Sequence, residues 1–158
     1  MKPWNLFNVS GQLGRLFPWC GYFFLMVVAA TPVGGQEPLK PIAPRFKPDP
    51  QVYTGATGGR VPLSELVVGK PNGSCQGFSS QTPNHTLTIQ RDFGFLSMQV
   101  SADRRLTLMV KGPDGVFCRS GQKAELTGAW VSGKYEIWVG TDNGDRTDYR
   151  LSISETSQ

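Results

Sequence analysis

The sequence has one histidine, three cysteines and no acidic residue before Glu37. Charged residues make up only 18% of the chain. Its basic residues are scattered, without the clustered basic surface that binds nucleic acid. After residue 35, no window of 11 or more residues repeats its apolar side chains with a helical period. These absences argue against a nucleic-acid-binding protein and against a helical fold.

Glycine and proline are abundant, with 19 and 12 residues in a chain of 158. This length suits one domain, and this composition is typical of a turn-rich all-β protein. The formal net charge is +4. If residues 1–35 are removed with Lys2 and Arg15, 14 basic and 12 acidic residues remain, so the rest of the chain is nearly neutral.

The amino-terminal segment has the features of a secretory signal peptide. Lys2 and Arg15 precede an apolar run of 12 residues at 19–30, which ends in small side chains. Cleavage is expected after Ala30 or after Gly35. The run is shorter than the ~20 apolar residues of a membrane-spanning helix. Residues 1–35 are therefore interpreted as a signal peptide, with an uncleaved anchor or a mis-assigned start as alternatives, and the protein as secreted or periplasmic.

Export bears on the cysteines. Once Cys20 leaves with the signal peptide, Cys75 and Cys118 form an even pair in an oxidising compartment, where disulfides persist. A bond between them would close a loop of 43 residues. On the chain-entropy model, that closure stabilises the folded state by about 3–4 kcal/mol. Two buried free thiols are the alternative.

Residues 36–59 contain five prolines and end in a glycine-rich stretch. This composition favours extended chain that cannot build a core, so a linker is expected here. From residue 60 to 158 the pattern changes to short alternating runs between turn residues, which predicts one folded domain.

About eight strands are expected in this domain, arranged as an antiparallel β-sandwich or jelly roll. A phase slip near Gly94 and Leu96 predicts a β-bulge. The expected strands cover residues 63–68, 86–90, 93–100, 105–110, 115–118, 124–128, 134–140 and 148–153.

Few residues suggest chemistry. His85 follows a turn and has no partner in a recognisable catalytic or zinc motif, so a surface turn residue is expected. The loop at 141–148 offers Asp142, Asn143, Asp145 and Asp148, and calcium prefers such oxygen ligands. Its spacing is not that of an EF-hand, and an ordinary hairpin turn is the alternative.

Two tryptophans could contact a carbohydrate or a protein partner. Trp138 falls on the polar phase of its expected strand, and Trp130 lies just before a turn. An exposed flat aromatic side chain can stack on a sugar ring. The alternative is that both tryptophans close the core.

The motifs of the last hundred residues resemble a known family. They are Gly112-Pro113-Asp114-Gly115 at the end of one strand, a Gly-x-Trp-x-x-Gly-x-Tyr-x-Ile-x-Val run at 128–139, and a Tyr-x-Leu-x-Ile strand at 149–153. Residues 60–158 are similar in this way to the bacterial pre-peptidase C-terminal (PPC) domain. The resemblance implies a jelly-roll-like β-sandwich with a non-catalytic accessory role in secreted proteins.

One departure from the family concerns a metal site. Relatives often carry acidic residues directly after the cysteine-bearing strand, whereas this chain has Arg119-Ser120-Gly121. An arginine repels a cation, which puts a calcium site at that loop in doubt.

The sequence therefore predicts an exported, non-catalytic β-sandwich module that binds a protein or an envelope polysaccharide outside the cytoplasmic membrane. The alternatives are a structural partner of a secreted enzyme and a weak calcium-binding module. No cofactor is expected apart from that calcium ion, no nucleic acid is expected, and a membrane is expected as a partner only if residues 1–35 stay uncleaved.

Overall fold

The computed structural model describes residues 37–156, which form an all-β structure with a predominantly antiparallel sheet. This confirms the predicted fold class. Within this range the strands are β1 (Glu37–Pro38), β2 (Gln51–Thr57), β3 (Val61–Pro62), β4 (Phe78–Ser79), β5 (His85–Ile89), β6 (Phe93–Gly112), β7 (Gly115–Trp130), β8 (Gly133–Thr141) and β9 (Thr147–Ser154). The signal peptide predicted for residues 1–35 lies outside the described residues.

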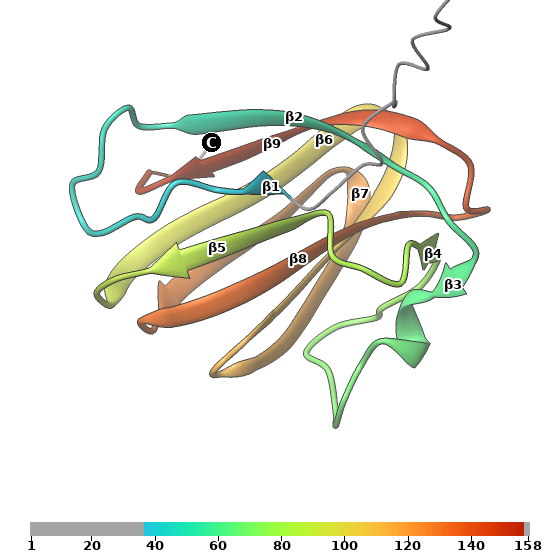
Figure 1. Ribbon diagram of the computed structural model, residues 1–158, viewed down its shortest axis with the longest axis horizontal. Coiled ribbons are helices and arrows are strands. Elements are labelled where there is room, and N and C mark those ends of the chain that lie inside the picture. Colours follow the sequence, from blue (N-terminus) through green and yellow to red (C-terminus); the bar gives the residue numbers. More distant parts are fainter. Residues whose placement is uncertain (1–36, 157–158) are drawn as a thin grey trace, which may run out of the picture. The chain divides into compact units, whose positions relative to one another are not determined.

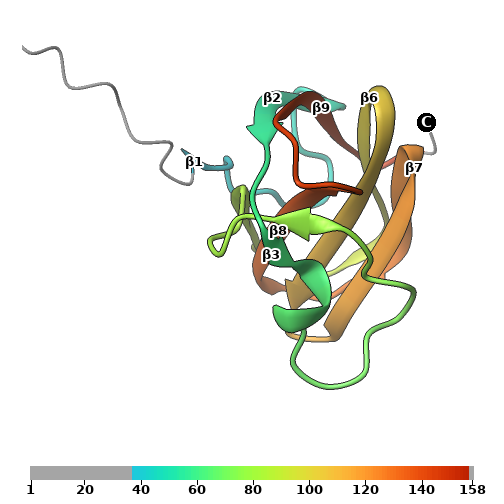
Figure 2. The same cartoon turned by 90° about the vertical axis from the view of Figure 1, so that its right-hand side faces the viewer.

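The sheet curls because its central strand belongs to two layers. The first half of β6 pairs with β9, and its second half pairs with β8. β7 follows β6 along its whole length as the other arm of a long hairpin. The strand order is β1-β5-β8-β6-β9-β2, so β1 and β2 lie at opposite ends of this path and the sheet bends into a half-barrel (Figures 1 and 2).

The main core fills the inside of this curl. It draws on both layers, for example Leu87 of β5, Leu108 of β6 and Leu151 of β9, which are all fully buried. Tyr135 of β8 is also fully buried there. These positions alternate along their strands, because successive side chains of a strand point to opposite faces.

The predicted bulge is present in β6. The pairing with β7 shifts between Phe93 and Leu96, and it shifts again between Ser101 and Leu106. A bulge bends a strand and increases its twist. The second shift lies where β6 passes from β9 to β8, so it coincides with the change of layer.

The Gly112-Pro113-Asp114-Gly115 segment is the predicted turn. Gly112 pairs with Gly115, which leaves Pro113 and Asp114 as a two-residue hairpin loop between β6 and β7. The Tyr135 ring lies so close to Gly112 that a β-carbon there would clash with it. A glycine at position 112 therefore leaves room for the Tyr135 ring.

The linker predicted for residues 36–59 is wrong for most of its length. β2 pairs with β9 over seven residue pairs, from Gln51 to Thr57. Upstream of it, Leu39, Ile42 and Phe46 are buried in the main core. Prolines did indicate extended chain here, but the apolar residues between them pack against the curled sheet.

The strand predicted at 63–68 is also wrong. Leu63–Glu65 form a 3-10 helix, and no strand covers residues 66–68. Leu63 is nevertheless fully buried, with Leu66 and Val67 packed beside it. The apolar residues here cover the outside of the sheet instead of extending it.

Candidate functional site

A groove of about 590 Å³ lies along the end of β2 and is the candidate site. One wall is formed by residues 54–59 and the other by residues 80 and 82–85. Gly144, Arg146 and Tyr149 complete the lining. The groove thus lies at the open side of the half-barrel, where the end of β2 faces the start of β5.

His85 and Tyr149 join the two layers at this groove. The Tyr149 hydroxyl oxygen lies 2.8 Å from Nε2 of His85, and the two rings meet edge to face with centroids 5.8 Å apart. Each residue is only 5% exposed. The prediction of His85 as a surface turn residue is therefore wrong, because a tyrosine 64 positions away along the chain covers it.

The chemistry of Tyr149 is set by its burial. Burial disfavours the phenolate and raises the pKa of Tyr149 well above its ordinary value of 10.0. The hydroxyl group is then protonated at neutral pH. It can therefore share a hydrogen bond with Nε2 of His85.

Gly55 allows Tyr149 to reach His85. A β-carbon at Gly55 would lie 2.6 Å from the Tyr149 hydroxyl oxygen, closer than non-bonded atoms approach. Gly55 is paired with Tyr149 in the β2–β9 ladder. The absence of a side chain at Gly55 is therefore what lets the phenol ring pass beneath β2 to β5.

Side chains from three segments close the outer edge of β8 beside the groove. The main-chain N–H of Val139 donates to Oδ1 of Asn84 at 2.8 Å, and the carbonyl oxygen of Val139 accepts from Oγ of Ser79 at 2.9 Å. The Thr57 hydroxyl donates to the same carbonyl. These bonds satisfy main-chain groups in the gap between β5 and β4, so they hold the groove walls together.

The hydroxyl groups of Thr57 and Ser79 are thus both engaged with the carbonyl oxygen of Val139. Oγ of Ser80 likewise donates to the carbonyl of Thr82 at 2.6 Å. A catalytic nucleophile needs a base that accepts its proton. The serine and threonine hydroxyls at Thr57, Ser79 and Ser80 instead donate their protons to the main chain.

Arg146 supplies the charge of the groove. No aspartate or glutamate lines the groove, and within the described range Arg146 has no ion pair. Its side chain belongs to an exposed residue in the loop between β8 and β9. The groove is therefore polar, nearly free of charged groups, and able to receive one anion.

The predicted calcium ligands do not converge. Nδ2 of Asn143 donates to Oδ2 of Asp145 at 2.6 Å, and that oxygen also lies 3.7 Å from Nη1 of Arg104. Asp142 is exposed in the loop, while Asp148 lies on β9. Over residues 37–156, no group of three or more His, Cys, Asp or Glu side chains could hold a metal ion. Melting with calcium and with a chelator decides between a calcium site and an ordinary hairpin turn at this loop.

Both tryptophans are in the core. Trp130 and Trp138 are 5% and 4% exposed, so the predicted partial exposure of Trp138 is wrong. Nε1 of Trp130 donates to the carbonyl of Leu96 at 3.0 Å, and its ring meets that of Tyr135. Neither tryptophan offers a face on which a sugar could stack.

Trp138 is buried by a second, smaller cluster on the outside of the sheet. It packs with the disulfide and with Leu63, Met109 and Val116. The Cys75–Cys118 disulfide is present, with the two Cα atoms 5.2 Å apart. It ties the segment that follows the 3-10 helix to β7, so this segment covers Trp138.

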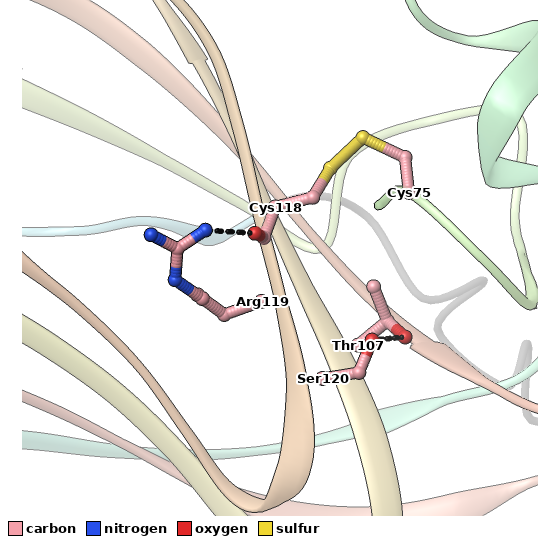
Figure 3. The surroundings of a disulfide bond; sticks show 5 residues. All are labelled: Cys75, Thr107, Cys118, Arg119 and Ser120. Carbon is pink, nitrogen blue, oxygen red and sulfur yellow. Dashed lines mark hydrogen bonds between the residues drawn. A yellow bond between two sulfur atoms is a disulfide. The ribbon is translucent and has the colours of Figure 1, made fainter. Parts of the chain in front are cut away.

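The two residues after Cys118 make hydrogen bonds within the β6–β7 hairpin (Figure 3). Nη1 of Arg119 donates to the carbonyl oxygen of Cys118 at 3.0 Å. The hydroxyl groups of Thr107 and Ser120 lie 2.7 Å apart and bond β6 to β7. The residue directly after Cys118 thus carries a guanidinium group bonded to the main chain.

Asp114 has a local role at the tip of the same hairpin. The Tyr135 hydroxyl donates to the carbonyl of Val131 at 2.8 Å and lies 3.3 Å from Oδ1 of Asp114. Burial, with the negative charge of Asp114 as a smaller cause, raises the pKa of Tyr135. This contact fixes the turn and gives Asp114 no catalytic partner.

The groove was not recognised from the sequence. Its walls come from the predicted linker and from the turn before β5, and the sequence predicts Tyr149 only as part of a strand. The one signal in the sequence was the run of small, uncharged residues from Thr54 to Gly59. In addition, no helix in the described part of the chain is long and apolar enough to cross a membrane.

Comparison with known proteins gives few relatives. No protein-family model matches the chain. Over 85 residues it is 33% identical to an uncharacterized protein of Synechococcus elongatus. This match covers 49% of the chain and 63% of the length of that protein.

Among solved structures, the chain is similar to the pre-peptidase C-terminal domain of collagenase from Bacillus anthracis. The TM-score is 0.44 and the sequence identity is 13%, over 76% of this chain and 97% of that chain. No ligand, partner or activity of that domain is carried over to this chain.

Proposed function

We propose that this protein is an exported, non-catalytic module that binds a partner outside the cytoplasmic membrane in the groove between β2 and residues 80–85. The groove itself is the observation that carries the proposal. It is about 590 Å³ in volume, within the usual size of ligand sites, and its walls are held by hydrogen bonds between segments distant in the sequence.

The chemistry of the groove supports binding over catalysis. The hydroxyl groups of Thr57 and Ser80 donate to carbonyl oxygens, and the Tyr149 hydroxyl has a raised pKa. Cys118 is in a disulfide and has no thiol. The hydroxyl groups of Thr57 and Ser80 and the sulfur of Cys118 are therefore not activated as nucleophiles. This favours a role in binding.

Export is supported by two independent features. The Cys75–Cys118 disulfide fits an oxidising compartment, and residues 1–35 have the pattern of a signal peptide. A protein of the cell envelope would meet protein and polysaccharide partners there.

Retention of envelope components on the immobilised full chain tests this proposal. Thr54 is exposed and lines the groove, so Thr54→Arg should fill it, whereas Thr88→Arg places the same side chain at an exposed position of β5 outside the groove. We expect Thr54→Arg to reduce retention at least tenfold, which corresponds to about 1.4 kcal/mol, and Thr88→Arg to leave it unchanged.

Both variants should melt within a few degrees of the natural protein, because both substitutions are at exposed strand positions. Protease or glycosidase treatment of the retained material identifies its class. Equal retention by Thr54→Arg and the natural protein would exclude the groove as the binding site.

A further inference from the structure

The end of β2 presents a sheet edge to the groove. Among the described residues β2 pairs with β9 alone and is therefore an edge strand. Unpaired N–H and C=O groups of an edge strand can pair with another extended chain.

The main chain of Thr54 and Ala56 faces away from β9. The carbonyl oxygen of Ala56 accepts a long hydrogen bond, 3.4 Å, from Nδ2 of Asn84 across the groove. In an antiparallel ladder the orientation alternates, so the N–H and C=O groups of Thr54 point the same way as those of Ala56. In the described range, no other segment bonds to the Thr54 main chain.

Apart from the long hydrogen bond between Asn84 and Ala56, this edge has none of the usual protection. Within Gln51–Thr57 there is no charged residue and no proline, and Val52 is 38% exposed. Natural proteins normally block a free edge with lysine, proline, a bulge or a covering loop. An unblocked edge beside a groove is a feature of strand-adding binding sites.

The edge of β7 provides an internal comparison. There Asn72 bonds to the outer side of the strand, with its N–H donating to Val116 O at 2.7 Å and its carbonyl accepting from the N–H of Cys118 at 2.8 Å. The disulfide holds this covering segment in place. The fold thus covers the start of β7 and leaves the main chain of Thr54 in β2 open.

The charge of the groove indicates what the added strand carries. Arg146 is its one charged lining residue and has no ion pair within the described range. A guanidinium group binds a carboxylate through two parallel hydrogen bonds. Stacking on a sugar would need an exposed aromatic face, but Tyr149 is 5% exposed and both tryptophans lie in the core.

We infer that the groove binds an extended peptide, which adds as a strand to β2 and places an acidic side chain or its terminal carboxylate against Arg146. Residues 54–57, the part of β2 that lines the groove, span roughly 14 Å at about 3.4 Å per residue, enough for four residues of the partner. This inference rests on the proposed function and names the chemical class of the partner at the same groove.

A library of random octapeptides, panned on the immobilised full chain, tests the inference. We expect enriched octapeptides that alternate β-branched and polar residues and carry aspartate or glutamate at one fixed position. Thr54→Pro should weaken the binding of an enriched octapeptide at least tenfold, because proline removes the N–H that faces the groove and leaves the β9 ladder intact. Thr54→Lys, which blocks the edge without changing the main chain, should have the same effect.

The carboxylate contact is tested by a double-mutant cycle. Arg146→Gln and the replacement of the acidic residue of the octapeptide by its amide should each weaken binding, and together they should weaken it no further than either alone. Thr88→Lys serves as the control and should change nothing.

Failure to enrich any octapeptide would overturn the inference, as would enrichment that survives both Thr54→Pro and Thr54→Lys, or retention of oligosaccharides alone. If envelope retention is still lost in Thr54→Arg, only the strand-addition inference fails. If Thr54→Arg has no effect either, the groove is not the binding site at all.

Discussion

The hydroxyl oxygen of Tyr149 lies 2.8 Å from Nε2 of His85, and this contact connects β9 of one layer with β5 of the other. Both side chains are buried and both line the groove. The bond therefore has two consequences, since it closes the curled sheet on its open side and forms the floor of the candidate site.

Removing this bond should destabilise the protein measurably. Tyr149→Phe takes away the hydroxyl group and leaves Nε2 of His85 without that partner, which costs about 1–3 kcal/mol for a buried group. Tyr53→Phe is the matched control, because the Tyr53 hydroxyl donates to Oε1 of Gln51 in a half-buried position. Urea unfolding should give the larger loss for Tyr149→Phe, and equal losses would contradict the special role of the His85 contact.

Stability should fall at alkaline pH, and Tyr149 should contribute to the fall. Its pKa is raised in the folded state, so above pH 10 the unfolded chain releases the phenolic proton while the folded chain retains it. The contribution of the neutral phenol is complete below pH 10 and declines above it, with a slope of about 1.4 kcal/mol per pH unit for one tyrosine.

Tyr149→Phe removes the contribution of Tyr149 to this decline and leaves those of Tyr53 and Tyr135, whose pKa values are also raised by burial. The free energy of unfolding, measured between pH 9 and 11, should therefore decline less steeply in the variant. Parallel curves for the two proteins would show that Tyr149 titrates alike in the folded and unfolded states.

The disulfide should contribute about 3–4 kcal/mol to stability, because it closes a loop with a sequence separation of 43 residues. Cys75→Ala with Cys118→Ala should lower the free energy of unfolding by at least this amount. Thiol titration of the denatured full chain checks the bond itself. One thiol, that of Cys20, is expected before reduction and three after it, and three before reduction would refute the disulfide.

The two tryptophans should respond differently to the same substitution. Trp130→Phe removes an N–H that donates to the carbonyl of Leu96, whereas Nε1 of Trp138 has no hydrogen-bond partner among the described residues. Trp130→Phe should therefore cost about 1 kcal/mol more than Trp138→Phe.

Trp138→Ala should in turn cost about 3–5 kcal/mol, as expected for a core tryptophan. Thermal or urea unfolding of the three variants checks both statements. A Trp138→Ala variant as stable as the natural protein would place this side chain on the surface.

Calcium should not change the stability of the protein. Asp145 is already bonded to Asn143 and lies near Arg104, and the other acidic residues of the loop do not converge on it. We therefore expect equal melting temperatures with calcium and with a chelator. A rise of several degrees with calcium that a chelator reverses would establish the loop as a calcium site.

Local patterns predicted the parts of the fold that local chemistry fixes. The alternation at 86–90, 134–140 and 148–153 gave β5, β8 and β9 within one or two residues. The glycines and proline of Gly112-Pro113-Asp114-Gly115 gave the hairpin, because turn geometry depends on those residues themselves. The phase slip gave the bulge in β6 for the same reason.

Whether another segment of the chain buries a given face of a strand, in contrast, was decided only by the tertiary structure. The alternation in β8 correctly separates Trp138 from Tyr135, Ile137 and Val139, since they belong to different clusters. It could not reveal that the segment ending at Cys75 lies over the second face. A period of two specifies which way a side chain points, and a covering segment comes from elsewhere in the chain.

The candidate site depended on such distant contacts even more strongly. The prolines of residues 36–59 predicted a linker, yet apolar side chains of this segment reach the core and β2 completes one layer. His85 and Tyr149 each follow a local pattern that says nothing of the other. The sequence by itself determined the strands, their faces and their turns, whereas only the curl of the sheet brought β2, His85 and Tyr149 together, because contacts between residues 64 positions apart depend on the packing of the whole domain.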